Sequence, residues 1–237
     1  MMKPFKFKQF TIHQDRCAMK VGTDGVLLGA WSAIDSQPKS ILDIGAGTGL
    51  IALMLAQRIL ADTIDALEIE AAAYEQCVEN FEASIWADRL FCFHASLAEF
   101  IEETEDRYDM IVSNPPFYSE ENAGGNPLRD LARQNQFLPY EMLLEGVSKL
   151  LSKNGKFSTI IPFTEEESFL DLAKHNGFYP NRVTRVKGNS KVGIKRSLLE
   201  LGRNNCEFDY DELIIEIKRH KYTPEYIALT RDFYLKL

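Results

Sequence analysis

The feature that most constrains the fold is a regular alternation of short apolar runs and longer amphipathic stretches between residues 41 and 113. Apolar runs of strand length begin near Ile41, Ile64, Leu90 and Tyr108. The stretches between them have helical patterns, over about 50–60, 71–84 and 97–103. Strands that alternate with helices form right-handed crossover units and hence a parallel sheet with helices on both faces. The sequence therefore predicts a doubly wound α/β core.

The remaining segments predict additions to this core. A helix over 140–151 leads through Asn154-Gly155 to an apolar strand at 157–161, and a helix over 165–175 follows. Two further strands, 179–187 and 197–202, flank a Gly/Lys-rich turn and predict an antiparallel hairpin. We expect a single domain over 1–237. Its parts are an N-terminal extension with a strand or hairpin and a helix (1–40), a catalytic α/β core (41–203), and a C-terminal strand and helix (204–237).

Composition narrows the protein class. The chain has 237 residues, and no apolar run approaches the roughly 20 residues that a membrane-spanning helix needs, so we expect no membrane association and a cytoplasmic location. Its cysteines and histidines show no metal-ligand spacing, so no metal site is expected. The net charge of -8 argues against nonspecific nucleic-acid binding by the whole surface, although unevenly placed charge can still form a local basic face.

A glycine loop follows the first core strand. Gly45, Gly47 and Gly49 stand at alternate positions, where a backbone without side chains can turn tightly and approach a ligand. The alternative is a tight strand-to-helix turn without a ligand. Glu68 favours binding, because a carboxylate at the end of the next strand accepts hydrogen bonds from ribose hydroxyls. Asp43, before the loop, would repel a pyrophosphate but can organise loop amides and accept from an ammonium group, so S-adenosylmethionine fits and NAD does not.

The second motif is Asn114-Pro115-Pro116-Phe117, just past the carboxyl end of the fourth predicted strand. The two prolines stiffen the backbone and remove two donors, which leaves a site rich in acceptors. The side-chain oxygen of Asn114 and the carbonyl of Pro115 could accept the two N–H bonds of a planar amine, while Phe117 stacks on the base or amide. A rigid double-proline turn is the alternative. The motif predicts methyl transfer to a planar nitrogen.

With these two motifs, the chain resembles the class I methyltransferases that act on amino groups, whose fold is Rossmann-like with a seven-stranded, mostly parallel sheet, an antiparallel C-terminal hairpin and helices on both faces. The resemblance extends over nearly the whole chain to the bacterial valine-tRNA adenine-N6 methyltransferases. The further segments that carry it are Met19–Trp31, Lys195–Glu200, Tyr222–Tyr226 and Asp232–Leu235. It implies methylation of adenine N6 at adenosine 37, beside the anticodon, with the tRNA anticodon stem-loop as partner.

The resemblance also implies site residues. The segment Met19–Asp24 would close over the cofactor, with Lys20 and Thr23 contributing contacts, and Ile69 would join Glu68 in the cofactor site. Relatives usually carry an Asp after the third strand to bind the cofactor's adenine amine. This chain reads His94-Ala95-Ser96-Leu97 there, so Ser96 or a backbone group must take that contact.

Basic residues are concentrated between 182 and 203. Of these, Lys187, Lys191, Lys195 and Arg196 are expected to contact RNA, with Tyr118 assisting Phe117 at the substrate. A hairpin kept soluble by charge is the alternative. An rRNA guanine-N2 methyltransferase, a protein glutamine-N5 methyltransferase and a cofactor-binding RNA module without chemistry are competing functions. We expect a monomer.

Overall fold

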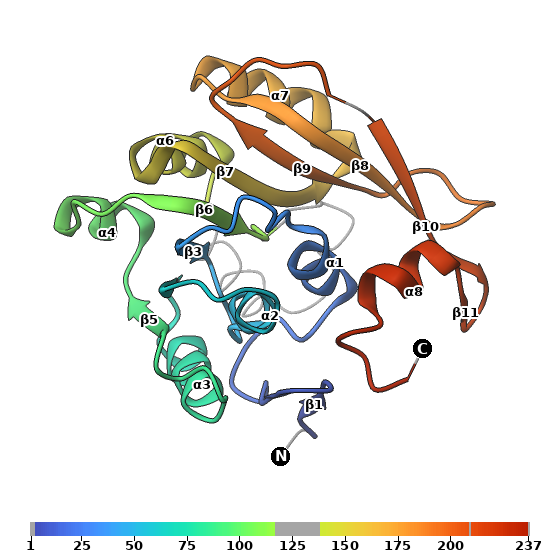
Figure 1. Ribbon diagram of the computed structural model, residues 1–237, viewed down its shortest axis with the longest axis horizontal. Coiled ribbons are helices and arrows are strands. Elements are labelled where there is room, and N and C mark those ends of the chain that lie inside the picture. The colour runs from blue at the N-terminus through green and yellow to red at the C-terminus, as the bar shows by residue number, and fades with distance from the viewer. Residues whose placement is uncertain (1–2, 117–137, 209, 237) are drawn as a thin grey trace, which may run out of the picture.

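The computed structural model describes residues 3–116, 138–208 and 210–236. Within these ranges the chain builds one large mixed sheet with helices on both faces (Figure 1). Its strands are β3 (Ser40–Ile44), β4 (Thr63–Glu68), β5 (Leu90–His94), β6 (Tyr108–Ser113), β7 (Leu151–Pro162), β8 (Tyr179–Asn189), β9 (Arg196–Gly202), β10 (Tyr210–Lys218) and β11 (Lys221–Tyr222). The predicted α/β class is confirmed.

The strand order is β11-β10-β8-β9-β7-β6-β3-β4-β5. Strands β3 to β7 run parallel, and β9 is antiparallel to both of its neighbours. The predicted hairpin is therefore present, but the predicted count of seven strands is wrong, because the described sheet has nine. The C-terminal strand β10 pairs in parallel with the outer edge of β8, and β11 then pairs with β10. This pairing satisfies backbone groups that an open edge would leave unpaired.

Helices cover the two faces of the sheet in two groups. On one face lie α1 (Thr23–Trp31), α2 (Leu50–Arg58), α3 (Ala71–Glu82) and α8 (Pro224–Thr230), and on the other lie α4 (Leu97–Glu103), α6 (Tyr140–Leu150) and α7 (Glu166–His175) (Figure 1). A short 3-10 helix, η2 (Phe163–Glu165), precedes α7. Ile41 and Leu42 belong to the two different cores, as successive strand residues on opposite faces must. The crossover connections predicted between 41 and 113 are confirmed.

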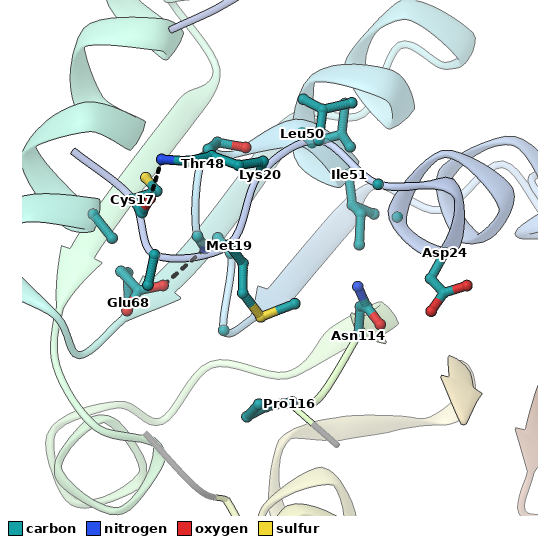
Figure 2. A pocket seen from close by; sticks show the side chains of 18 of the residues that line it. Cys17, Met19, Lys20, Asp24, Thr48, Leu50, Ile51, Glu68, Asn114 and Pro116 are labelled. Carbon is teal, nitrogen blue, oxygen red and sulfur yellow. Dashed lines mark hydrogen bonds between the residues drawn. The ribbon is translucent and has the colours of Figure 1, made fainter. Parts of the chain in front are cut away.

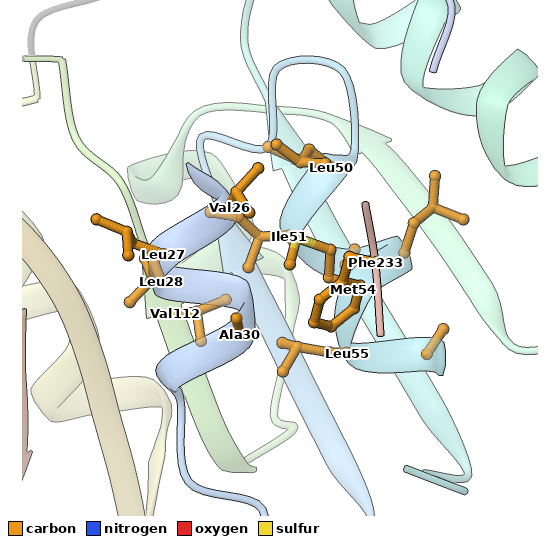
Figure 3. Close-up of a cluster of buried hydrophobic side chains, with 14 of the residues drawn as sticks. Val26, Leu27, Leu28, Ala30, Leu50, Ile51, Met54, Leu55, Val112 and Phe233 are labelled. Atoms are coloured by element: carbon orange, nitrogen blue, oxygen red, sulfur yellow. The ribbon is translucent and has the colours of Figure 1, made fainter. Parts of the chain in front are cut away.

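Helix α1 is fixed by close packing on α2. Val26 and Leu27 belong to the same buried cluster as Leu50 and Ile51, and Figure 3 shows Val26 beside Ile51. A Cβ atom at Gly29 would lie 2.8 Å from the Met54 sulfur, so glycine is required for this approach. Because α1 is anchored here, the residues just before it are held next to the loop that precedes α2.

One strand boundary differs from the prediction. The sequence predicts that Asn154-Gly155 connects a helix ending at 151 to a strand at 157–161, but β7 already begins at Leu151 and includes the pair. Between the pairs Tyr108↔Leu151 and Met110↔Lys156 the register shifts, so the extra residues of β7 form a bulge. A Cβ atom at Gly155 would lie 2.9 Å from the Tyr108 carbonyl oxygen, so the glycine permits close approach within the sheet rather than a turn before it.

The two ends of the chain meet. The predicted N-terminal strand or hairpin is a hairpin, with β1 (Phe5–Lys6) antiparallel to β2 (Thr11–Ile12). Phe7 forms an isolated bridge with Tyr234, and the Lys8 amide donates to the Phe233 carbonyl over 2.9 Å. No helix in the described ranges is both long and apolar enough to cross a membrane.

Candidate active site

A cavity of about 510 Å³ opens at the carboxyl edge of the parallel strands. The loop after β3, the end of β4 and the residues after β6 line it from the sheet, and the segment 17–25 lines it from the N-terminal side (Figure 2). In open α/β sheets ligands bind outside the carboxyl ends of the strands. Both sequence motifs therefore meet in one cavity, as the spacing predicted.

The glycine loop takes a backbone shape that glycine alone adopts easily. Gly45, Gly47 and Gly49 have φ angles of +75°, +57° and +77°. Gly45 and Gly47 line the cavity, and a Cβ atom on either would meet nothing within 4 Å. Gly49 lies outside the lining: its Cβ would come within 2.5 Å of the Phe81 ring, so this glycine lets α2 pack on α3. The predicted triplet thus divides into two cavity positions and one packing position.

Glu68 positions the loop from the end of β4. Its Oε2 accepts the Gly47 N–H over 2.8 Å, and its Oε1 accepts the Glu70 N–H over 2.8 Å. Burial raises the pKa of this carboxyl, and the two amides act in the opposite direction. Glu68 and the half-exposed Ile69 both line the cavity. The side chain is therefore fixed at the ligand edge with each carboxylate oxygen holding one backbone amide.

Asp43 lies beneath the loop rather than in the lining of the cavity. Its side chain is 0% exposed, and Oδ2 accepts the Ala52 N–H at the start of α2 over 3.2 Å. Its Oδ1 is buried without a hydrogen-bond partner among the described residues. Burial, opposed by the Ala52 amide, raises the pKa of Asp43 to about 7. The carboxyl joins the end of β3 to the first turn of α2, so the amide that it accepts belongs to the helix and not to the loop that the sequence predicts. Its contact with a ligand ammonium stays a prediction.

Asn114 presents a side-chain acceptor that has no partner in the described ranges. The residue lines the cavity together with Pro116, while Pro115 is buried. Among the described residues, nothing hydrogen-bonds to the buried Oδ1 atom of Asn114. The Ser113 hydroxyl donates to the Ile44 carbonyl over 2.9 Å, which joins β6 to β3 directly before the two motifs. A buried acceptor without a donor is costly, so it marks a place where a ligand N–H can bind. Phe117 and Tyr118 lie outside the described residues.

The N-terminal segment (residues 13–25) forms the wall opposite the sheet. Residues 17–25 of it line the cavity, including the predicted Lys20 and Thr23. The Lys20 ammonium donates to the carbonyls of Gln14 and Cys17 over 2.6 and 2.5 Å, so it stabilises the bend of the segment itself. Thr23 is the first residue of α1. Desolvation raises the pKa of the Cys17 thiol to about 12, which keeps it protonated and unreactive.

Two buried polar residues of α3 hold this segment and were missed in the sequence. Asn80 and Gln76 are each 1% exposed. The Asn80 Oδ1 accepts the His13 N–H, and its Nδ2 donates to the carbonyls of His13 and Thr48, each over 2.9 Å. Gln76 accepts the Arg16 N–H over 3.3 Å. Asn80 therefore joins the N-terminal segment to the glycine loop. The available signal was the spacing of these amides, four residues apart within the buried stripe of α3.

Comparison with known proteins agrees with this geometry. Residues 25–161 match the family model described as the methyltransferase small domain. A tRNA1(Val) (adenine(37)-N6)-methyltransferase from Flavobacterium johnsoniae is 62% identical over 234 residues, which cover 98% of this chain and 100% of the relative. One of the same name from Bacteroides fragilis is 46% identical and covers both chains fully. The chain belongs to this methyltransferase family.

A solved structure extends the comparison to the fold of this methyltransferase. A protein from Agrobacterium tumefaciens, described as a predicted O-methyltransferase, has a TM-score of 0.69 at 18% identity and covers 89% of this chain and 96% of its own. At this identity the likeness concerns the fold alone. Together with the family match, it confirms the Rossmann-like methyltransferase fold that the resemblance implied. The described ranges contain no group of three or more His, Cys, Asp or Glu residues placed to hold a metal ion.

Ser96 borders a second hollow of this methyltransferase. The hollow has a volume of about 360 Å³ and shares Ile69 with the main cavity. The Ser96 hydroxyl donates to the Glu99 carboxylate over 2.7 Å and accepts the Glu99 N–H, which completes a capping box at the start of α4. Ser96 thus stands next to the main cavity rather than in its lining, and its hydroxyl proton is already used.

The basic residues predicted to contact RNA differ in their surroundings. Arg196 lines the cavity, and its Nε donates to the Asp24 carboxylate over 2.9 Å. Lys187 forms a 2.6 Å ion pair with Glu212 on β10. Lys191 and Lys195 are exposed in the turn between β8 and β9. Because β8 runs parallel to β10 and to the core strands, this turn lies at the same edge of the sheet as Asn114.

Proposed function

We propose that this methyltransferase transfers the methyl group of S-adenosylmethionine to the exocyclic N6 of an adenine in tRNA. The proposed target is adenosine 37 of valine tRNA, the position in the name of its relatives. The observation that carries the proposal is the buried Oδ1 of Asn114, which has no hydrogen-bond partner among the described residues and lies in a cavity shared with the glycine loop and Glu68. A planar amine can supply an N–H donor to this oxygen.

The residues of the cavity fit the proposed cofactor. Gly45 and Gly47 leave open space where side chains would stand, and Glu68 offers carboxylate lone pairs beside them. The hollow next to Ile69, bordered by Ser96, extends the cavity in the direction of β5 and provides room for an adenine ring. When bound, S-adenosylmethionine supplies a methyl group on a positively charged sulfur. We assign Asp43 an indirect part, as the carboxyl group whose oxygen accepts an amide in the first turn of α2 and so positions it.

Catalysis rests on positioning the acceptor nitrogen. The lone pair of an exocyclic amine is delocalised into the ring and is a weak nucleophile. Asn114 Oδ1 and the carbonyl of Pro115 would each accept one of its N–H bonds, which holds the nitrogen in place and favours a more tetrahedral, reactive geometry. Preorganised acceptors of this kind need no reorganisation during the reaction. Stacking of the base on Phe117, assisted by Tyr118, remains a prediction from the sequence.

RNA binding is proposed at the same edge of the sheet. Lys191 and Lys195 lie exposed there, and Arg196 reaches the cavity itself. Lys187 contributes after release from Glu212. We further propose that the whole chain acts as one monomeric domain, since segment 204–237 adds β10 and β11 to the sheet of the core. We also propose that it acts in the cytoplasm, where a tRNA substrate is found.

The test uses tRNA, rRNA and protein fractions from cells that lack the gene, incubated with labelled S-adenosylmethionine and followed by nucleoside mass spectrometry. N6-methyladenosine at position 37 of valine tRNA is expected. Labelled rRNA containing N2-methylguanosine, or a labelled protein glutamine, would overturn the proposal in favour of that chemistry.

A variant pair tests the mechanism. Asn114→Ala should lower kcat on the order of 100-fold or more, as the loss of a preorganised hydrogen-bond partner does, with cofactor affinity within about twofold of wild type. Asn154→Ala is the matched control, because Asn154 is exposed in β7 near the opposite edge of the sheet. Full methyl transfer by Asn114→Ala would remove Asn114 from the mechanism.

A further inference from the structure

The turn between β10 and β11 carries three exposed basic side chains: Lys218, Arg219 and Lys221. Within the described part of the chain, none of these side chains makes a hydrogen bond, ion pair or ring contact. Within the turn, His220 has a φ angle of +61°, and its N–H donates to the Glu216 carboxylate over 3.1 Å. The three basic residues of the turn are exposed to solvent.

Strand direction places this turn at the active-site edge. β10 is parallel to β8, which has the direction of the core strands, so β10 ends at the edge where Asn114 and the glycine loop lie. Glu216 pairs with Asn189, the last residue of β8, so the β8–β9 turn and the β10–β11 turn follow adjacent strands at this edge of the sheet. Figure 1 shows the connection between β8 and β9 extending past the end of β10 on that side.

The cavity and the β10–β11 turn are close enough to serve one ligand. Arg196 lines the cavity at the start of β9. In the register of the sheet it lies opposite Val186 of β8, and Val186 lies opposite Leu213 of β10. The separation between Arg196 and the turn has two components. Across the sheet it is two strand spacings, about 10 Å, and along β10 it is five residues, about 17 Å. The turn thus lies roughly 20 Å from Arg196, outside the lining of the cavity but at the same edge of the sheet.

The charges of this region fit a polyanion. The whole chain carries a net charge of -8, so cations gathered at one edge are a local exception. On β10, Glu212 forms an ion pair with Lys187, and Glu216 accepts the His220 N–H. Three cations that have no partner among the described residues, at the sheet edge that holds a cavity for a base, match the phosphate backbone of the strand that carries that base.

We infer that the β10–β11 turn is a phosphate-binding element that holds the tRNA backbone beside the cavity through Lys218, Arg219 and Lys221. This inference rests on the proposed function, because it takes the RNA that donates the adenine as the ligand. The turn supplies affinity without base readout. It extends the predicted contacts of Lys191 and Lys195 onto the next strand of the sheet.

The test neutralises the turn in the full-length protein with Lys218→Gln, Arg219→Gln and Lys221→Gln together. The matched control changes three exposed cations near the opposite edge of the sheet, with Lys39→Gln, Arg107→Gln and Lys153→Gln. Binding of an unmodified valine tRNA transcript is measured by filter retention between 50 and 300 mM salt, a range chosen on the order of the physiological value. Methyl transfer and thermal unfolding are recorded for the same proteins.

The turn variant should bind tRNA roughly 10- to 100-fold more weakly near 0.1 M salt, with KM for tRNA rising in parallel. Its plot of log affinity against log salt should be shallower by about 2, as expected for three lost phosphate contacts. Its kcat at saturating tRNA and its unfolding temperature should match wild type, and the control should behave as wild type throughout.

Two results would overturn the inference while leaving the proposed function intact: unchanged affinity and salt slope in the turn variant, or an equal loss in the control. If wild type binds and methylates rRNA instead of tRNA, the proposed function fails, and the same affinity and slope comparison on rRNA decides the inference. If wild type binds no RNA, both are wrong.

Discussion

Asn80 gives the sharpest test of how the cofactor cavity is held. The variant Asn80→Ala removes three 2.9 Å hydrogen bonds that join α3 to both backbone groups of His13 and to the Thr48 carbonyl. At about 1 kcal/mol net for each bond, the loss is roughly 3 kcal/mol, which corresponds to about 100-fold in an equilibrium constant. Because these bonds order the N-terminal segment against the glycine loop, we expect most of the loss in cofactor affinity.

Calorimetric titration with S-adenosylmethionine measures this affinity, and steady-state kinetics separates KM from kcat. KM for the cofactor should rise by up to about 100-fold while kcat at saturation changes only a few-fold. Asn80→Asp keeps an acceptor for the His13 N–H but places a negative charge against the carbonyls of His13 and Thr48. Its affinity for the cofactor should therefore fall at least as far as that of Asn80→Ala. Glu82→Ala, an exposed change on the same helix, is the control. Wild-type cofactor affinity in Asn80→Ala, combined with lower global stability, would refute a positioning role.

Two further predictions concern stability of the cofactor-free protein. Burial raises the pKa of Asp43 to about 7, whereas the pKa of an aspartate in an unfolded chain is about 4. The folded protein therefore holds this proton more tightly than the unfolded chain does. The stabilisation that comes from the bound proton is lost as pH rises from about 4 through 7. Denaturant unfolding of Asp43→Asn should therefore show a stability gain over wild type that grows by up to roughly 4 kcal/mol across that window; a constant difference would contradict the assignment. The free energy of unfolding of Gly49→Ala should be about 3 kcal/mol lower than that of wild type, because φ is +77° at this position and the new Cβ would lie 2.5 Å from the Phe81 ring. The control Gly188→Ala has open surroundings and should lower it by about 1 kcal/mol or less.

The sequence was most informative where local patterns determine structure. Runs that begin near Ile41, Ile64 and Tyr108 form parallel strands because their apolar residues are buried on both faces of the sheet. The ends of those strands then fix where Gly45, Glu68 and Asn114 lie, since parallel strands bring their carboxyl ends to one edge. Site residues that follow a strand directly were therefore predictable from spacing alone.

Interactions between distant segments were harder to predict. Asn80 contacts His13 and Thr48, which are 67 and 32 positions away, and its own sequence environment resembles an ordinary polar helix face. The parallel pairing of β10 with β8 joins segments separated by a hairpin, and no local pattern specifies it. The same pairing gives Lys187 an acidic partner, Glu212, that a count of basic residues does not reveal. Such contacts depend on the assembled sheet.

The meeting of the two chain ends has a consequence for biosynthesis. The segment that lines the cavity follows a hairpin whose Phe7 pairs with Tyr234, while Lys8 contacts the backbone of Phe233. Residues 7 and 8 are thus held by residues 233 and 234, which are added later in synthesis. The glycine loop and its strands can form while the chain is still growing, but the wall opposite them gains this support only after residues 233 and 234 have been added. A partly made chain therefore has the cofactor loop before it has the fully supported cavity.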